Sequence, residues 1–257
     1  MYNREYRVLL LAARQAGKYL LKMSRRPVRI DFKGKIDPVT EADTGAERII
    51  VKILRQYFPD DDILTEESQD QRRQSIRRWI IDPLDGTTNY SHGFPFWCVS
   101  IAFEVGGVVE SGAVFGPVLV EFFSARRGKG AFLNGKRIMV SKQNRLDRCL
   151  LATGFPYDVH TSKDDNLRHF GRFIKRAQAV RRPGSAALDL AYVACGRFDG
   201  FWEMKLKPWD CATAALLVEE AGGRVSDYSG RAFSIYKPEC LASNGRVHGK
   251  MIDVINR

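Results

Sequence analysis

One segment holds most of the chemical information in the chain: Trp79-Ile80-Ile81-Asp82-Pro83-Leu84-Asp85-Gly86-Thr87-Thr88-Asn89. Its apolar start is typical of a β-strand, and Pro83 ends the strand because proline has no N–H and a φ fixed at about −65°. Asp85 follows on the same turn, where Gly86 permits backbone angles that a side chain would exclude. Two carboxylates are thereby fixed at the end of a rigid strand. Such hard oxygen ligands suit Mg²⁺, which takes one or two carboxylates per ion and keeps several waters.

An ordinary turn with an Asx hydrogen bond is the alternative interpretation of this segment, because Asp, Pro and Gly are the usual turn residues. Two other acidic segments favour the metal site. Glu66-Glu67 stands shortly before the strand, and Trp209-Asp210 stands at the start of an apolar helix far downstream. The carboxylates that would supply oxygens for two or more adjacent cations are Glu66, Asp82, Asp85 and Asp210.

The composition fits one large folded unit of 257 residues. No apolar run reaches the ~20 residues that a membrane-spanning helix needs, and the N-terminus lacks the pattern of a signal peptide. The five cysteines form no C-x-x-C pair, which predicts reduced core thiols and argues against a zinc site. We therefore expect a cytoplasmic protein without membrane contact.

The net charge of +11 comes from scattered arginine pairs and not from one basic run. A basic field would attract phosphorylated substrates, and it could equally bind nucleic acid through its phosphates. No aromatic interleaving, helix-turn-helix or RNA-binding signature accompanies the charge. A solvated basic surface is the simplest interpretation, and the sequence leaves nucleic-acid binding open but unsupported by a motif.

Hydrophobic periodicity predicts helices over residues 7–22, 44–58, 166–179, 186–194 and 210–221. Thr44 and Glu47 form a candidate capping box for the second helix, and the polar segment 24–38 is expected to be a mobile loop. Strand-like segments cover 96–105, 108–115, 118–124 and 131–140, with short strands near Ala179, Phe201, Arg224 and Leu241. An antiparallel meander followed by alternating helices and strands predicts an α/β layered sandwich.

The acidic segments, followed by Glu219-Glu220-Ala221-Gly222-Gly223, together resemble the inositol monophosphatase family in order and spacing over most of the chain. That family consists of Mg²⁺-dependent, lithium-sensitive phosphomonoesterases, and the segment 154–157 looks more like its bacterial members. The resemblance implies a layered α-β-α-β-α sandwich of the sugar-phosphatase type, with an antiparallel N-terminal sheet and a smaller C-terminal sheet. We expect a single phosphatase domain over 1–257, built from two tightly packed halves at about 1–142 and 143–257.

The resemblance also implies two to three Mg²⁺ ions per active site. Glu66, Asp82 and the carbonyl of Leu84 would hold the first ion. Asp82 would bridge to a second ion, held also by Asp85 and Asp210, and a third, weaker ion would rest on Glu66. Two cations ~3.5–4 Å apart can clamp the attacking and leaving oxygens of a phosphoryl transfer, and they lower the pKa of bound water.

Three further residues have catalytic roles by this resemblance. Thr87 would orient the attacking water, with Glu66 or Asp43 accepting its proton. Asp43 ends the matching pattern Asp37-Pro38-Val39-Thr40-Glu41-Ala42-Asp43, and it would also favour the positive end of the helix that follows. Lys33 resembles the loop residue that helps to close the site, although its neighbour Lys35 could take that position.

Substrate contacts divide between the two ends of the ester. The phosphate would meet backbone N–H groups of Gly86, Thr87 and Thr88, with Asp85 and Asp210 beside it. Segment 182–187 resembles the family's Gly-Thr/Ser-Ala turn, which would place the backbone of Gly184, Ser185 and Ala186 against the substrate ring. Glu203 would accept hydrogen bonds from ring hydroxyls, or else be a surface charge beside a core strand. Tyr157 and Arg172 could also touch the substrate.

The function that this set implies is hydrolysis of inositol 1-phosphate, or a similar polyol or sugar phosphate, by metal-activated water. Fructose-1,6-bisphosphatase activity, alone or shared, is the nearest enzymatic alternative. An alternative of a different class is an RNA-binding or transcription-complex protein with secondary phosphatase activity. The resemblance further implies a homodimer, in which the apolar segments 94–97 and 114–123 would meet a two-fold mate.

Overall fold

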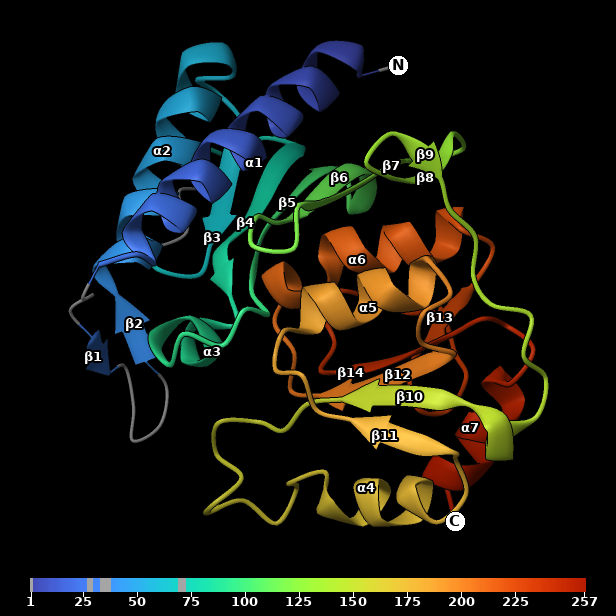
Figure 1. Ribbon diagram of the computed structural model, residues 1–257. Helices are drawn as coiled ribbons and strands as arrows, with labels where there is room; N and C mark the ends of the chain where they lie inside the picture. The colour runs from blue at the N-terminus through green and yellow to red at the C-terminus, as the bar shows by residue number, and fades with distance from the viewer. Residues whose placement is uncertain (1, 27–29, 33–37, 69–72) are drawn as a thin grey trace.

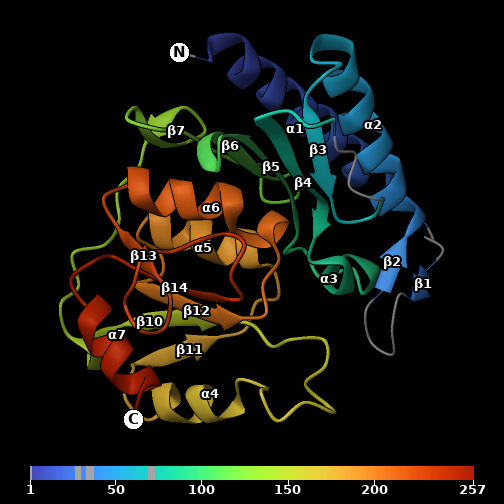
Figure 2. The same cartoon turned by 180° about the vertical axis from the view of Figure 1, so that it is seen from behind.

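The structure is a computed structural model that describes residues 2–26, 30–32, 38–68 and 73–257. Its helices and two main sheets stack in alternating layers, so the predicted α-β-α-β-α sandwich is confirmed (Figure 1). The outer pair of helices comprises α1 (Asn3–Met23) and α2 (Glu41–Tyr57), and the middle pair comprises α5 (Ala186–Ala194) and α6 (Pro208–Glu220). The other face of the second sheet carries α4 (Leu167–Ile174) and α7 (His248–Ile255), seen from behind in Figure 2.

The first sheet has seven strands in the order β3-β4-β5-β6-β7-β8-β9. Their bounds are β3 (Asp62–Thr65), β4 (Arg77–Asp85), β5 (Cys98–Val105), β6 (Val108–Gly116), β7 (Glu121–Arg126), β8 (Gly130–Leu133) and β9 (Lys136–Arg137). Neighbouring strands are antiparallel, as predicted, except that β3 and β4 are parallel. The prediction missed this pair because a parallel pair needs a connection longer than a hairpin turn, and a hairpin signal cannot reveal it.

The second sheet has five strands in the order β11-β10-β12-β14-β13. Their bounds are β10 (Leu150–Thr153), β11 (Ala179–Arg181), β12 (Gly200–Met204), β13 (Arg224–Ser226) and β14 (Glu239–Ser243). The sheet is mixed, since β10 is parallel to both of its neighbours and β14 is antiparallel to its own. All strands of the first sheet precede residue 142 and all strands of the second sheet follow it. The division of the domain into two halves at this residue stays a prediction.

The start of α2 corrects one prediction. The helix begins at Glu41, and Thr40 is its N-cap. The Thr40 side chain accepts hydrogen bonds from Ala42 N and Asp43 N, while Asp43 Oδ2 accepts one from Thr40 N at 2.8 Å. The capping box therefore uses Thr40 and Asp43, three residues after it. Glu47, predicted to cap the helix, instead accepts a hydrogen bond from Thr65 Oγ1 at 2.6 Å and ties α2 to the end of β3.

Other boundaries also differ from the sequence expectation. The predicted helix over 166–179 ends at Ile174, and only its last predicted residue, Ala179, belongs to β11, where a short strand was also predicted. Within the segment expected to be a loop, β1 (Ile30–Phe32) pairs with β2 (Pro38–Thr40). The strand β10 and the helix α7 were not predicted, because each is a short apolar run without a clear period. A short helix, α3 (Thr87–Ser91), follows β4, and a 3₁₀ turn, η1 (Leu146–Arg148), precedes β10.

The cores explain why the layers hold together. Trp79 and Phe103 lie between the first sheet and the outer helices, with ring centroids 4.7 Å apart. The middle helices α5 and α6 are apolar on nearly every side, as expected for helices buried between two sheets. Trp202 stacks on Phe173 at 4.0 Å beneath the second sheet. The predicted core thiols are confirmed, since all five cysteines are free and four of them are buried.

No helix in the part of the chain that the structure describes combines the length and the apolar character needed to cross a bilayer. Gly222 directly follows Ala221, the C-cap residue of α6, and has a φ of 86°. Its N–H donates to Glu219 O at 3.0 Å, so this glycine ends the helix.

His248 is a buried histidine that the sequence analysis did not distinguish from the surface ones. Its two ring nitrogens lie 2.8 Å from Ser226 Oγ and 2.9 Å from Ser243 Oγ. Burial, and to a lesser degree the positive charge of Arg224, lower the pKa of His248 to about 4. The ring is therefore neutral in the folded protein and joins β13, β14 and α7.

We expect the protein to lose stability in acid through His248. Its pKa is lower in the folded than in the unfolded state, so its contribution is complete above about pH 6.5 and is lost as the pH falls toward about 4. The contribution is up to about 3 kcal/mol. Thermal unfolding at several pH values in this range should show a weaker pH dependence for His248→Gln than for the wild type. His160→Gln, at an exposed position, is the control, and equal pH dependence in all three proteins would contradict this account.

Candidate active site

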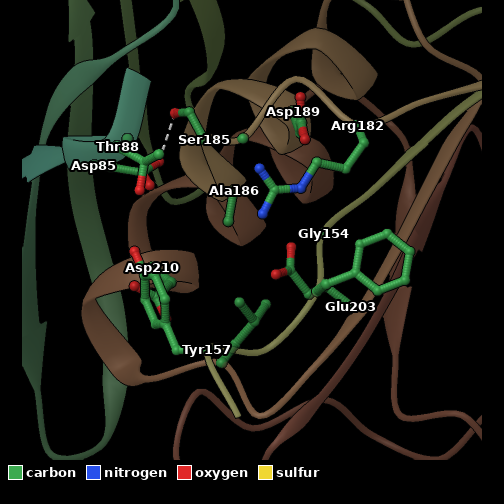
Figure 3. A pocket seen from close by; sticks show the side chains of 14 residues that line it. Asp85, Thr88, Gly154, Tyr157, Arg182, Ser185, Ala186, Asp189, Glu203 and Asp210 are labelled. Atoms are coloured by element: carbon green, nitrogen blue, oxygen red, sulfur yellow. Dashed lines mark hydrogen bonds between the residues drawn. The ribbon is translucent and has the colours of Figure 1, made fainter. Parts of the chain in front are cut away.

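A polar pocket is lined by residues of β4, α3, α5, β12 and α6. Figure 1 shows where these elements lie. Residues from four distant parts of the chain line it, as Figure 3 shows for ten of them. The full lining is Asp85, Gly86, Thr88, Gly154, Phe155, Tyr157, Arg182, Gly184, Ser185, Ala186, Asp189, Glu203, Leu206 and Asp210. Most of these residues carry polar groups, so the pocket suits a polar ligand.

The end of β4 positions the first two carboxylates. The register with β5 shifts between Asp82 and Asp85, because Pro83 cannot donate to the ladder. Asp82 is buried, and its Oδ1 accepts a hydrogen bond from Leu84 N at 3.0 Å. Asp85 Oδ2 accepts hydrogen bonds from Ser185 Oγ at 2.6 Å and Ala187 N at 2.8 Å (Figure 3). The start of α5 thus fixes Asp85 across 100 residues of sequence.

The other two acidic residues, Glu66 and Asp210, lie on two further parts of the chain. Glu66 directly follows β3, and Thr65 pairs in register with Ile81. The parallel pairing therefore places Glu66 beside Asp82, at the same end of the sheet. Asp210 lies in the first turn of α6, where its Oδ2 accepts a hydrogen bond from Lys207 N at 2.6 Å. This bond orients Asp210 toward the end of β4 as part of the helix cap.

The pKa shifts of these groups indicate that the groups lie near one another. The pKa of Asp82 is well above its usual range because of burial, and next because of the negative charges of Glu66, Asp85 and Asp210. Burial also raises the pKa of Asp210 well above its usual range, with Glu66 and Asp85 adding to the effect. For Asp85, burial raises the pKa, and the bonds from Ser185 and the α5 backbone partly offset it. Mutual repulsion of this kind is relieved by a divalent cation.

The donor set fits Mg²⁺. The convergent side chains are all carboxylates, and the backbone carbonyl of Leu84 adds another hard oxygen beside Asp82. Within the described residues, no three His, Cys, Asp or Glu side chains are already gathered tightly around one point. Instead, Asp82, Asp85 and Asp210 each direct one oxygen to a hydrogen-bond donor of the protein. An ion would have to draw the carboxylates together.

Thr87 and Asp43, both predicted to be catalytic, are in direct contact. Thr87 Oγ1 lies 3.0 Å from Asp43 Oδ1 and 3.0 Å from the carbonyl oxygen of Leu84. Asp43 is fully buried, and burial raises its pKa in spite of the hydrogen bonds that it accepts from Thr40 and Thr87. The charge of Glu66 contributes to the raised pKa values of Asp82 and Asp210.

One end of the pocket is formed by the turn from β4 into α3. Gly86 is the N-cap of α3 and has a φ of 93°, a conformation that favours glycine. A Cβ at this position would also lie 3.0 Å from the carbonyl oxygen of Phe96. Gly86 and Thr88 line the pocket, and the first N–H groups of a helix have no acceptor within the helix. The geometry thus brings polar N–H groups and carboxylates to one end of the pocket.

Glu203 and segment 184–186 form the opposite end. Ser185 is the N-cap of α5, and Gly184 and Ala186 line the pocket on either side of it. Glu203 extends from β12 into the pocket, where burial, and next the charge of Asp85, raise its pKa to about 8. A Cβ at residue 154 would lie 2.1 Å from Glu203 Oε1, so Gly154 makes the space for this carboxyl group. Glu203 is therefore a pocket residue and not a surface charge.

Two predicted substrate contacts have different outcomes. Tyr157 lines the pocket. The prediction that Arg172 touches the substrate was wrong. Its guanidinium donates a hydrogen bond to the carbonyl of Ile255 at 2.6 Å, where α4 contacts α7 on the far side of the second sheet. Its position in the sequence gave no information on the face of α4 that it occupies. Lys33 and Lys35 lie outside the described residues.

The sequence analysis missed Asp189, and it overlooked the side chain of Arg182. Both line the pocket, together with Phe155 and Leu206. Asp189 is a buried acid in the otherwise apolar run of α5, one turn after Ser185. A charged residue on the same face of an apolar helix as its N-cap is the signal that could have identified it, because residues four apart lie on one side of a helix.

Comparison with known proteins identifies the family to which the chain belongs. The model of the inositol monophosphatase family matches residues 2–257. The Nus factor SuhB of Pseudomonas aeruginosa is 42% identical, with 96% of this chain and 94% of that protein covered. The inositol monophosphatase structure from Anabaena has a TM-score of 0.91 at 38% identity, covering 98% of this chain and 95% of that one. The extragenic suppressor protein SuhB of Bartonella henselae also has a TM-score of 0.91, at 39% identity and 98% coverage of both chains. The chain therefore belongs to the inositol monophosphatase family.

Proposed function

We propose that the protein is a Mg²⁺-dependent phosphomonoesterase that hydrolyses inositol 1-phosphate or a similar polyol phosphate. The observation that supports this proposal most is the convergence of Asp82, Asp85 and Asp210 beside a pocket whose far end holds Glu203. Carboxylates at one end would hold cations against the phosphate, and the carboxyl group at the other would accept hydrogen bonds from the alcohol.

Each metal ligand follows from its position. Glu66, Asp82 and the Leu84 carbonyl would hold one Mg²⁺, and Asp82, Asp85 and Asp210 a second, with two to three ions per site in all. When bound, these ions would supply positive charge at the phosphate and lower the pKa of a coordinated water. Sensitivity to lithium belongs to the same proposal, at a weaker position on Glu66.

Within the chain itself, Thr87 and Asp43 would orient the attacking water and move its proton. The Thr87 hydroxyl has one hydrogen and two acceptors at 3.0 Å, Asp43 Oδ1 and Leu84 O. A water that donates to Thr87 Oγ1 would pass its proton toward Asp43 along this bond. The raised pKa of Asp43 makes it a better base than an exposed carboxylate. We therefore favour Asp43 over Glu66 as the proton acceptor.

The leaving-group end favours a polyol over an apolar alcohol. Glu203 presents a carboxyl group at the wall of the pocket, and Ser185 and Asp189 add further oxygens. An apolar leaving group would remove these groups from water without giving them hydrogen-bond partners, which is unfavourable. A sugar or polyol hydroxyl satisfies them.

Fructose 1,6-bisphosphate is a second candidate substrate. A larger cavity adjoins the pocket and shares Phe155, Tyr157, Glu203, Leu206 and Asp210 with it. Lys205 and Lys207 line this cavity, and Lys205 Nζ is held by Asp158 at 2.8 Å. A second phosphate could be neutralised there, so an activity shared between the two esters fits the shape of the cleft.

A role in transcription is proposed from the relatives. The similar protein of Pseudomonas aeruginosa is named a Nus factor, and the net charge of this chain is +11. Binding of RNA or of a transcription complex would use this basic surface and would accompany the phosphatase activity in the cytoplasm.

We also propose a homodimer. Val118, Leu119 and Val120 form an exposed apolar turn between β6 and β7, and Phe94 is half exposed. These side chains lie within the two segments that the sequence analysis assigned to the interface. Trp97 contributes to the core instead, since only 3% of it is exposed. A two-fold pairing over this turn would cover apolar surface that one chain leaves in water.

The test of the proposed function is phosphate release from a panel of esters with Mg²⁺ present. We expect the highest kcat/KM for inositol 1-phosphate or another polyol or sugar phosphate, with fructose 1,6-bisphosphate as the next candidate. Nucleoside monophosphates and aryl phosphates should be at least tenfold poorer, because they offer Glu203 fewer hydroxyl donors. Preference for an aryl phosphate, or no release from any ester, would contradict the proposal.

A further inference from the structure

Asp189 carries a buried oxygen for which the described residues supply no hydrogen-bond partner. The residue is 1% exposed and lies on α5, one turn after the N-cap Ser185. Its Oδ1 has no hydrogen-bond partner among the described residues. Buried polar groups are almost always hydrogen-bonded, since an unpaired one loses its water without compensation. An unpaired carboxylate oxygen in a pocket wall is therefore a candidate ligand-binding group.

Among the described residues, no cation forms an ion pair with Asp189. The nearby guanidinium of Arg182 lines the same pocket, and its charge opposes the rise in the pKa of Asp189. No ion pair or hydrogen bond joins the two side chains in the described part of the chain. Burial and the negative charges of Glu203 and Asp85 raise the pKa of Asp189 well above its usual range. Among the described residues, Asp189 thus lacks the ion pair that a buried structural acid normally has.

Asp189 and Glu203 face one space from two different elements. Figure 3 shows Asp189 on α5 and Glu203 on β12 around the pocket, with the Arg182 side chain between them. Gly154 leaves room for the carboxyl group of Glu203 on one side. The pocket therefore offers two carboxyl acceptors and one guanidinium donor to the same ligand. Neighbouring hydroxyls of one polyol could meet the two acceptors together.

We propose that Asp189 binds a hydroxyl of the leaving alcohol next to the hydroxyl bound by Glu203, and so selects esters of polyols with neighbouring hydroxyls. The proposal rests on the proposed phosphatase function and names its substrate class. The substrate hydroxyl donates to Asp189 Oδ1, and the Arg182 guanidinium can donate to the same hydroxyl oxygen. Asp189 acts on specificity and has no part in the attack on phosphorus, which takes place at the opposite end of the pocket.

A site of this type discriminates strongly against the wrong alcohol. An ester that lacks one hydroxyl leaves a buried acceptor unpaired, which costs more than the loss of a hydrogen bond in water. Esters with no hydroxyl on the ring should therefore bind poorly, although their phosphate groups and their chemistry are the same.

The experiment compares cyclohexyl phosphates that carry no hydroxyl, one hydroxyl on a ring carbon beside the ester carbon, or two hydroxyls on adjacent ring carbons, the first of them beside the ester carbon. Steady-state kcat and KM are measured with Mg²⁺ for the wild type, for Asp189→Asn and for the control Asp253→Asn, whose side chain is exposed on α7. In the wild type, the second hydroxyl should raise kcat/KM further, mainly through KM. In Asp189→Asn, the increase in kcat/KM that the second hydroxyl produces should be about tenfold smaller than in the wild type. The kcat/KM for the ester without hydroxyls should not change. The control should behave as the wild type.

Three results would overturn the assignment. One is an equal loss on all three esters in Asp189→Asn, which would show a structural role. Another is an unchanged gain from the second hydroxyl in that variant. The third, which needs no variant, is a wild-type kcat/KM that does not rise when the second hydroxyl is added. A wild type that releases phosphate from none of the esters, nor from inositol 1-phosphate, would instead contradict the proposed phosphatase function.

Discussion

Asp210→Asn is expected to lower the rate of phosphate release on the order of 1,000-fold or more while leaving the fold intact. The substitution removes one negative charge and one carboxylate ligand from the carboxylate group at the end of β4. The amide oxygen of asparagine can still accept the hydrogen bond from Lys207 N, which is 2.6 Å long in the wild type. Burial and neighbouring carboxylates disfavour the charged form of Asp210. Its neutralisation should therefore keep or raise the melting temperature of the metal-free protein.

The matched control is Asp253→Asn, an exposed aspartate on α7. Initial rates at saturating Mg²⁺ and thermal unfolding are measured for all three proteins. A rate for Asp210→Asn within tenfold of the wild type would contradict the assignment. The same inactive variant separates the two proposed roles, because RNA retention that falls with salt should survive the substitution if the basic surface binds RNA.

Removal of divalent cations is expected to reduce turnover to the background rate. Excess chelator leaves Asp82, Asp85 and Asp210 without a counter-charge, and the pKa values of all three are already raised by burial. Added Mg²⁺ should restore the rate fully. Ca²⁺ should bind without restoring it, since its longer bonds and looser geometry do not align the water and the phosphate.

The control for this experiment is the circular dichroism spectrum, which should remain that of the folded protein in chelator because the cores do not depend on the ions. Phosphate release that continues undiminished in excess chelator would rule out the metal mechanism. A rate restored equally by Ca²⁺ would contradict the requirement for the compact geometry of Mg²⁺.

Local signals made part of the site predictable. Asp82 and Asp85 could be assigned because a strand, a proline and a glycine follow one another within a few residues, and each limits the backbone by itself. The parallel pairing that brings Glu66 beside Asp82 was not predictable in this way. Its role came from the family resemblance, as did that of Asp210, because no local rule states which distant segments meet.

The start of α2 shows how two similar signals compete. Both Thr40–Asp43 and Thr44–Glu47 have the spacing of a capping box, and glutamate is the commoner partner. The structure uses Thr40 because the carboxylate of Glu47 accepts hydrogen bonds from Thr65 Oγ1 and Glu67 N, both distant in sequence. Tertiary contacts decided the boundary, and with it the burial of Asp43 beside Thr87.

Short strands and buried acids account for the remaining errors. The strands β10 and β11 have four and three residues, too few for a period to be read. The strand β10 was not predicted, whereas a short strand was predicted near Ala179, where β11 begins. Asp189 was not predicted as a site residue because its neighbours in the sequence are apolar. The polar residues that line the pocket with it come from β12 and from segment 182–184. Its significance depends on positions in space that the sequence does not display.

The central claim is that carboxylates from separate segments of the chain form one metal centre. Its most direct test is Mn²⁺ binding, followed by electron paramagnetic resonance in the presence of inorganic phosphate, for the wild type and for Asp82→Asn. Asp82 is buried among the other acidic groups and would bridge two ions. We expect at least two bound Mn²⁺ per chain in the wild type, in agreement with the proposed ligand set, and the loss of at least one in the variant. Equal Mn²⁺ binding by both proteins, or no binding by the wild type, would contradict the account.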